Sequence, residues 1–271
     1  MRDFEFLENK ARFLRISTLE MIMEAGSGHI GGSFSMAEIL TALYYDKMDL
    51  GKGIDDPDRD RFILSKGHAN PILYAVLLDK GFVDEKEKHT LRRLHSPFQG
   101  HPDSKKCPAL DCSTGSLGQG LSVAVGMALG LKKENRKGNV YVIVGDGELQ
   151  EGICWEALMF AASHSLDNLT VIVDRNGLQL SARTEETNAL ENLEAKMKSF
   201  NLDVSSINGH DYKEIFEALD KDSGNKPNCI IAHTVKGKGV SFMEDNVKWH
   251  GAMPTKEEAE EAYRELGGNN V

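Results

Sequence analysis

Two short apolar runs, each followed closely by polar residues, constrain the fold of this chain most. Val140–Val144 directly precedes a Gly-Asp-Gly tripeptide centred on Asp146, and Leu169–Val173 lies just before Asn176. Continuous apolar runs of this length are typical of parallel strands that are buried on both faces. The pattern predicts two neighbouring strands of an open α/β sheet. Asp146 and Asn176 would lie at their carboxyl ends, where such sheets bind ligands.

The polar residues at these strand ends suit a metal ion and an anion. Carboxylate and amide oxygens near a backbone carbonyl are ligands that Mg²⁺ takes, completing its shell with phosphate oxygens and water. Gly145 and Gly147 let the chain turn sharply and let a diphosphate approach the backbone. Glu151–Leu166 is long enough for a crossover helix whose N-terminus would point at the same anion. Alone, Gly-Asp-Gly and Asp-x-Asn are ordinary turn sequences, so their combination at this spacing carries the prediction.

Length, charge and cysteine content narrow the class of protein. A chain of 271 residues fits a single α/β unit, and its net charge of -10 argues against nucleic acid or an anionic membrane as a partner. No apolar run approaches the roughly 20 residues of a membrane span. The four cysteines form no Cys-x-x-Cys pair, which favours a reducing cytosol. The charged N-terminus predicts an amphipathic helix instead of a signal peptide, so we expect a cytoplasmic protein.

The remaining pattern predicts one doubly wound domain with a mostly parallel sheet flanked by helices. The first hundred residues show mostly helical patterns, broken by glycine-rich turns. Further strands are expected at Asp203–Ile207 and Cys229–Thr234. Helices are expected at Gly115–Leu131, Asp211–Leu219 and Thr255–Leu266, the last with a capping box formed by Thr255 and Glu258.

Seven ordered blocks of the sequence resemble those of transketolases, from about Ala11 to Pro254. They are Ser27–Leu40, Asp60–Leu77, Gly100–Asp103, Ser113–Ala128, Gly145–Gln179, Thr234–Phe242 and Trp249–Pro254. The resemblance implies the thiamine diphosphate-binding fold, and within it the domain that binds the diphosphate. It also implies that Asp146 and Asn176 hold Mg²⁺ through their side chains and Leu178 through its carbonyl. Ca²⁺ or Mn²⁺ can substitute.

The resemblance assigns further residues to the cofactor. Lys66 and His68 match residues that contact the diphosphate, and Gly145 and Gly147 belong to the same site. A loop that lines the cofactor contains Gly115, Ser116 and the apolar Leu117. Glu151 matches a carboxylate near the cofactor and the subunit interface. Lys236 would either line the cavity mouth or be a solvated loop charge, and Lys238 has the same two alternatives.

Three histidines are expected to act on the substrate. By resemblance, His101 hydrogen-bonds the donor sugar, whereas His29 and His250 handle the oxygen at the carbon–carbon bond that breaks, His250 also beside the cofactor. Imidazole suits this work because it titrates near neutrality. Which of His29 and His250 transfers the proton stays open. His210 is expected to be structural. The other histidines are expected to be surface or packing residues, namely His89, His95, His164 and His233.

The resemblance implies transfer of a two-carbon ketol unit from a ketose phosphate to an aldose phosphate. Full-length transketolases also have a pyrimidine-binding domain and a C-terminal domain, which residues 1–271 do not match. We therefore expect the N-terminal subunit of a split transketolase, working with a C-terminal subunit, in the form of a dimer of heterodimers.

Three alternatives remain open. One is a subunit of another thiamine diphosphate enzyme, such as a 2-oxo acid dehydrogenase or a deoxyxylulose-phosphate synthase. The second is a specialised transketolase acting on an unusual sugar phosphate or sulfosugar. The third is a non-enzymatic module that binds the cofactor or a partner.

Overall fold

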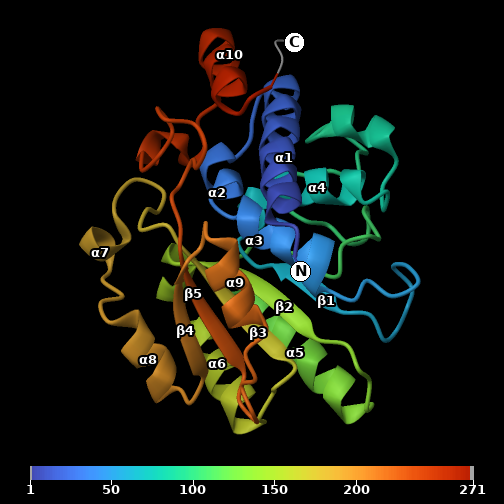
Figure 1. Ribbon diagram of the computed structural model, residues 1–271, viewed down its shortest axis with the longest axis vertical. Helices are drawn as coiled ribbons and strands as arrows, with labels where there is room; N and C mark the ends of the chain where they lie inside the picture. Colours follow the sequence, from blue (N-terminus) through green and yellow to red (C-terminus); the bar gives the residue numbers. More distant parts are fainter. Residues whose placement is uncertain (1, 269–271) are drawn as a thin grey trace.

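The computed structural model describes residues 2–268 and contains one five-stranded sheet in the order β1-β2-β3-β5-β4 (Figure 1). All four strand pairings in these residues are parallel. The predicted doubly wound α/β fold is thus confirmed. The strands are β1 (Arg61–Leu64), β2 (Val140–Gly145), β3 (Leu169–Arg175), β4 (Asp203–Asn208) and β5 (Asn228–His233).

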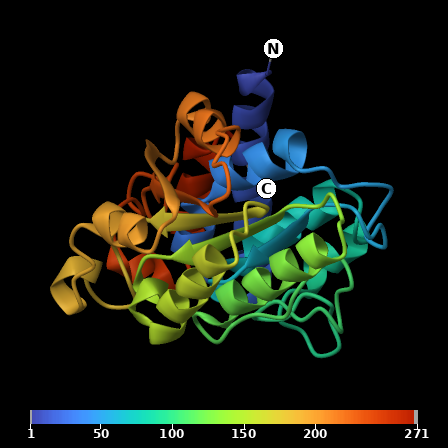
Figure 2. The ribbon, with the colours of Figure 1, turned by 90° about the horizontal axis from the view of Figure 1, so that it is seen from below.

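Helices cover both faces of the sheet, and α5 and α6 lie side by side on the face opposite α1 (Figure 2). One face carries α1 (Phe4–Ala25), α2 (Ile30–Phe34), α3 (Ala37–Ala42), α4 (Asn70–Asp79) and α9 (Tyr212–Leu219). The other carries α5 (Gln119–Lys133), α6 (Gly152–Ser163) and α8 (Leu193–Ser199). The two α-helices not yet named are α7 (Thr184–Thr187) and α10 (Lys256–Glu265). Of these, α10 packs on α1.

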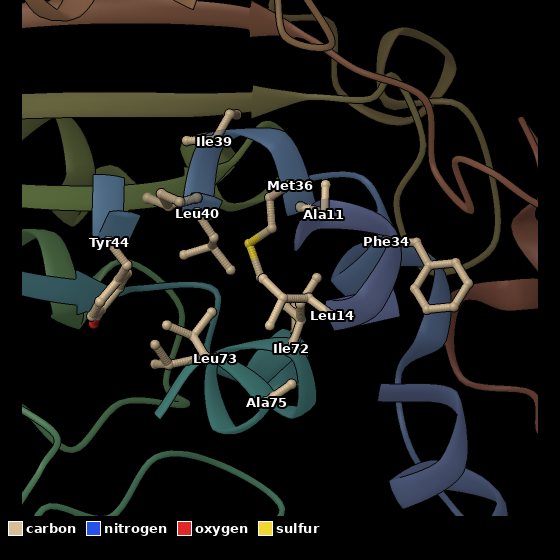
Figure 3. Packing of buried hydrophobic residues seen from close by; sticks show 14 of the residues in the cluster. Ala11, Leu14, Phe34, Met36, Ile39, Leu40, Tyr44, Ile72, Leu73 and Ala75 are labelled. Atoms are coloured by element: carbon tan, nitrogen blue, oxygen red, sulfur yellow. The ribbon is translucent and has the colours of Figure 1, made fainter. Parts of the chain in front are cut away.

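Alternate residues of the interior strand β2 divide between two cores, as the pleat of a strand requires. Tyr141 and Ile143 join the core under α1–α4, whereas Val142 and Val144 join the core under α5 and α6. In the first core, side chains from α1, α3 and α4 meet around Met36, which is fully buried (Figure 3). Because helices cover both faces of the sheet, we expect ligands to bind at the ends of the strands.

In the first half of the chain, one strand was not predicted and one helix begins later than expected. Arg61–Leu64, within a region expected to be mostly helical, forms the edge strand β1, which pairs with β2. Four residues are too few to display a strand period in the sequence. The helix expected from Gly115 begins only at Gln119, because Gly115 (φ 144°) and Gly118 (φ 83°) adopt conformations that L side chains rarely take.

The other predicted elements are confirmed to within a few residues at their ends. The capping box of Thr255 and Glu258 is present at the start of α10. Across residues 2–268, no helix combines the length and apolar character that crossing a membrane requires.

Candidate active site

The strand register brings the two predicted metal-binding segments together. Gly145 of β2 pairs with Asp174 of β3, so Asp146 lies beside the turn that carries Asn176. The Asp146 carboxylate accepts hydrogen bonds from the backbone of Gly147 (2.8 Å) and Gly177 (2.7 Å) and forms an ion pair with Arg175 (3.2 Å). Asp146 is therefore buried and held from both strands.

The donor set fits a magnesium ion. Asp146 supplies a carboxylate, Asn176 an amide oxygen and Leu178 a carbonyl, and all three residues line one cavity. Burial and the neighbouring Asp174 carboxylate raise the pKa of Asp146 despite Arg175, so an added cation would be stabilised there. Residues 2–268 contain no cluster of three or more His, Cys, Asp or Glu side chains placed to hold a metal. A site with a single carboxylate suits an ion that takes its remaining ligands from phosphate and water.

A cavity of about 400 Å³ at the carboxyl ends of the strands brings together most of the predicted cofactor residues. Its walls come from the turns after β1, β2 and β3, the loop before α5, the N-terminus of α2 and the segments after β5. The lining residues predicted from the sequence are His29, Lys66, His68, Gly115, Leu117, Gly145, Asp146, Gly147, Glu151, Asn176, Leu178, Lys236 and His250.

Three imidazoles cluster in this cavity. The ring centroids of His29, His68 and His250 lie 5.1–5.6 Å apart. Burial and the adjacent cations lower the pKa of His29 to about 4, of His68 to about 2 and of His250 to about 3. All three are therefore neutral at pH 7, with one ring nitrogen that donates and one that accepts.

Two lysines line the cavity, and both are 2% exposed. Lys66 pairs with Asp174 and donates to the carbonyl of Gly32 (2.7 Å). Lys236 donates to the carbonyl of Leu178 (3.0 Å) and to His250 Nδ1 (3.1 Å). Burial and the charge of Lys66 lower the pKa of Lys236 to about 8. Lys236 is thus a cavity residue, whereas Lys238 pairs with Glu244 near the surface.

Gly31 explains how Lys236 comes so close to α2. A Cβ atom at Gly31 would lie 2.7 Å from both Lys236 Cγ and the Trp249 carbonyl oxygen. Only glycine therefore allows the segment that ends at His250 to pack against this helix.

His101 lies apart from the other three imidazoles. It lines a neighbouring open hollow together with Gln99 and Lys105. Its ring packs on Gly115, where an added Cβ would meet ring atoms at 3.0–3.1 Å. Since Gly115 also lines the main cavity, the two hollows adjoin. Burial and Arg92 lower the pKa of His101.

The structure places the remaining predicted residues less centrally. Ser116 is exposed on the loop before α5, and Glu151, although it lines the cavity, is also exposed. His210 is structural, as expected, because it bonds Glu38 (2.9 Å) and accepts from the backbone of Val235 (2.9 Å).

Sequence reasoning missed three residues of this region. Glu148 is buried in the cavity wall and accepts from Ser65 Oγ (2.5 Å) and from the backbone of Gly118 (2.8 Å) and Gly145 (3.0 Å). Asp174 forms a buried ion pair with Lys66. Arg92 donates to His29 Nδ1 (3.2 Å) from a backbone with φ of 61°. Only Glu148 gave a usable signal, since it directly follows the Gly-Asp-Gly tripeptide.

Comparison with known proteins shows similarity to transketolases along nearly the whole chain. Residues 7–270 match the family model described as transketolase, thiamine diphosphate binding domain. The chain is 42% identical to an apulose-4-phosphate transketolase subunit of Phocaeicola vulgatus, covering 97% of this chain and 94% of that one. It is also 42% identical to a 6-deoxy-6-sulfo-D-fructose transketolase subunit of a Clostridium species, covering 96% of each chain.

Full-length relatives match over only part of their length. Human transketolase is 40% identical over 96% of this chain, which spans 42% of the human protein. The crystal structure of Campylobacter jejuni transketolase superposes with a TM-score of 0.93 at 34% identity, over 99% of this chain and 44% of that one.

Proposed function

Because the chain belongs to the transketolase family and matches its thiamine diphosphate-binding domain, we propose that it is the N-terminal subunit of a split transketolase. The reaction is transfer of a two-carbon ketol unit from a ketose phosphate to an aldose phosphate, with thiamine diphosphate and Mg²⁺ as cofactors. One observation carries the proposal. The three residues proposed to bind a metal and a cluster of neutral imidazoles share one cavity at the carboxyl ends of the strands.

The residues of the chain divide into three roles. Asp146, Asn176 and Leu178 would hold Mg²⁺, and His68 the diphosphate. When bound, thiamine diphosphate supplies the nucleophilic carbon. His29 and His250 both line the cavity, and one of them would take the proton from the substrate hydroxyl next to the bond that breaks.

His101 would contribute from the adjoining hollow. Its ring lies against Gly115, at the border between the hollow and the main cavity. From there it would hydrogen-bond the sugar and orient it, without touching the diphosphate.

We expect residues 1–271 to form the single cofactor domain, and a companion chain to supply the pyrimidine-binding and C-terminal domains. The Phocaeicola and Clostridium relatives match this chain over nearly their whole length, and both carry the word subunit in their names.

An exposed apolar face supports the same idea. Val123 of α5 and Met159 and Phe160 of α6 are 39–58% exposed, and added Cβ atoms at Gly126 and Gly130 of α5 would meet nothing within 4 Å. Leu117 and Leu180, also exposed, line the cavity itself. We expect the companion to dock on α5 and α6 and to close the cavity.

The direct test is ketol transfer from xylulose 5-phosphate to ribose 5-phosphate. The isolated chain should be inactive, and the chain purified together with its companion should be active. Turnover by the chain alone would contradict the need for a companion. Absence of thiamine diphosphate binding by the assembled complex would contradict the function itself.

A specialised substrate is the second candidate, and the names of the Phocaeicola and Clostridium subunits favour it. Apulose 4-phosphate and 6-deoxy-6-sulfofructose should be compared with xylulose 5-phosphate as donors for the same complex. The donor with the highest kcat/KM identifies the substrate class.

The docking face has its own test. Met159→Asp should weaken association with the companion, measured by native mass spectrometry, because it places a charge in an apolar contact. The matched control is Phe13→Asp, which changes an equally apolar, 45% exposed side chain on α1, across the sheet. Equal association of both variants would exclude this face.

A further inference from the structure

A carboxylate that none of the assigned roles uses lies behind the proposed metal and diphosphate sites. Asp174 at the end of β3 is fully buried. Its Oδ2 accepts from Ser35 Oγ (2.7 Å) and Asn176 Nδ2 (3.1 Å) and pairs with the Lys66 ammonium, while its Oδ1 accepts from Thr234. Four segments of the chain thus meet on one side chain.

We infer that Asp174 is a positioning residue with two roles. It orients the amide oxygen of Asn176 toward the metal, and it forms an ion pair with Lys66 so that this lysine does not bind the diphosphate. This inference rests on the proposed function, and it adds a role for two buried residues that the chemistry does not otherwise explain.

The Asn176 amide is held in one orientation. An asparagine amide has one end that accepts and one that donates, and only the oxygen can bind a cation. Because Asp174 holds Nδ2, the oxygen end is turned the other way, where it accepts from the backbone of Leu178 (3.1 Å). A free amide could turn its NH₂ group toward the metal and repel it. Partners of this kind, one step behind a metal ligand, typically affect metal affinity 10–100-fold.

The Lys66 ammonium is already satisfied by partners within the protein. An ammonium has three donors, and those of Lys66 face Asp174, the Gly32 carbonyl (2.7 Å) and Ser35 Oγ (3.5 Å). Lys66 lines the cavity, but these three partners occupy its hydrogen-bonding capacity. Its function is therefore to neutralise Asp174 and to tie α2 to the sheet, without donating to the diphosphate.

Two double variants separate the two roles without leaving a buried charge unpaired. Lys66→Met with Asp174→Asn removes both charges but keeps an acceptor. The new amide oxygen can take the place of Oδ2, and its NH₂ can donate to Thr234. Lys66→Met with Asp174→Ala removes the acceptor as well. The readout is the Mg²⁺ concentration that half-saturates thiamine diphosphate binding, measured by calorimetry on the complex with the companion.

We expect the asparagine double variant to need about as much Mg²⁺ as the wild type, and the alanine double variant to need roughly 10–100-fold more. An equal requirement for wild type and both variants would overturn the positioning role. Equal losses in both variants would show instead that Lys66 binds the diphosphate directly. If the wild-type complex bound no thiamine diphosphate, the proposed function would fail, which is a distinct result.

A measurement on the wild-type chain covers the case in which the alanine variant does not fold. The Asn176 side-chain amide proton that is donated to Asp174 should exchange slowly with solvent in NMR spectra. Exchange as fast as that of exposed asparagines such as Asn201 would contradict the inference.

Discussion

Glu38 of α3 should be one of the most sensitive positions for stability, although it lies outside the cavity. Its carboxylate accepts two hydrogen bonds of 2.7 Å from the Arg15 guanidinium and one of 2.9 Å from His210. His210 in turn accepts from the backbone of Val235, next to the site lysine Lys236. Glu38→Gln removes the charge and turns an NH₂ group toward one of these donors, leaving Arg15 with the Phe34 carbonyl (2.9 Å) and a single amide oxygen as acceptors.

The pKa of Glu38 sets the magnitude. Burial by itself would raise this pKa, but Arg15 and His210 lower it from 4.5 to about 2. A shift of this size corresponds to about 3 kcal/mol of stability at neutral pH. Because the folded-state pKa is the lower one, the contribution is complete above about pH 4.5 and is lost as the pH falls toward 2. Removing one partner of a buried ion pair costs a similar ~3–5 kcal/mol.

Urea unfolding of wild type and Glu38→Gln at several pH values tests this reasoning. The difference in unfolding free energy should be about 3 kcal/mol at pH 7 and should shrink steadily below pH 4.5. The control is Glu8→Gln on the exposed side of α1, which should change stability by less than about 0.5 kcal/mol. A difference for Glu38→Gln that stayed constant from pH 7 to pH 3 would refute the electrostatic explanation.

Three further predictions concern the cavity, each measured on the assembled complex. Asp146→Ala should abolish Mg²⁺-dependent binding of thiamine diphosphate in calorimetry; unchanged affinity would exclude it as a metal ligand. His68→Ala should weaken cofactor binding and be partly rescued by excess cofactor, whereas His101→Ala should keep cofactor affinity and lower kcat on the order of 10²–10⁴-fold. Their roles would be reversed if only His101→Ala lost cofactor affinity. Glu148→Ala, which leaves two backbone donors of the cavity wall without their acceptor, should lower the melting temperature and cofactor affinity together; a loss of neither would show that the wall holds without it.

The sequence was most informative where a clear strand pattern is followed directly by residues that can bind a ligand. The run Val140–Val144 predicted both a strand and a ligand-binding end, because a doubly buried strand needs an uninterrupted apolar run. The edge strand β1 gave no comparable signal. It is only four residues long and lies between charged residues and the Lys66 turn. Pairing with β2, more than its own sequence pattern, therefore makes this segment a strand.

Contacts between distant segments were beyond sequence reasoning. Asp174 looked like the ordinary first residue of an Asx turn, and its partners Ser35 and Lys66 lie more than a hundred residues away. Glu151, expected near the cofactor and the subunit interface, lines the cavity at an exposed position, whereas Glu148, which was not predicted, is buried in the cavity wall. The helical turn after Asp146 points Glu148 inward and leaves Glu151 at the surface.

The balance of charge in the cavity explains why an anion and a metal ion belong there together. Asp174 pairs with Lys66, whereas Asp146 shares its partner Arg175 with Glu185, so the protein itself offsets the Asp146 charge only in part. Lys236 hydrogen-bonds only neutral groups among its described partners, a carbonyl and an imidazole, and its pKa is lowered to about 8. A diphosphate would bring the counter-charge that Lys236 lacks and would raise this pKa again. A divalent ion on Asp146 would offset the rest of the diphosphate charge, which the neutral imidazoles do not. Each ligand therefore improves the electrostatic setting of the other, and binding of thiamine diphosphate and Mg²⁺ should be strongly cooperative.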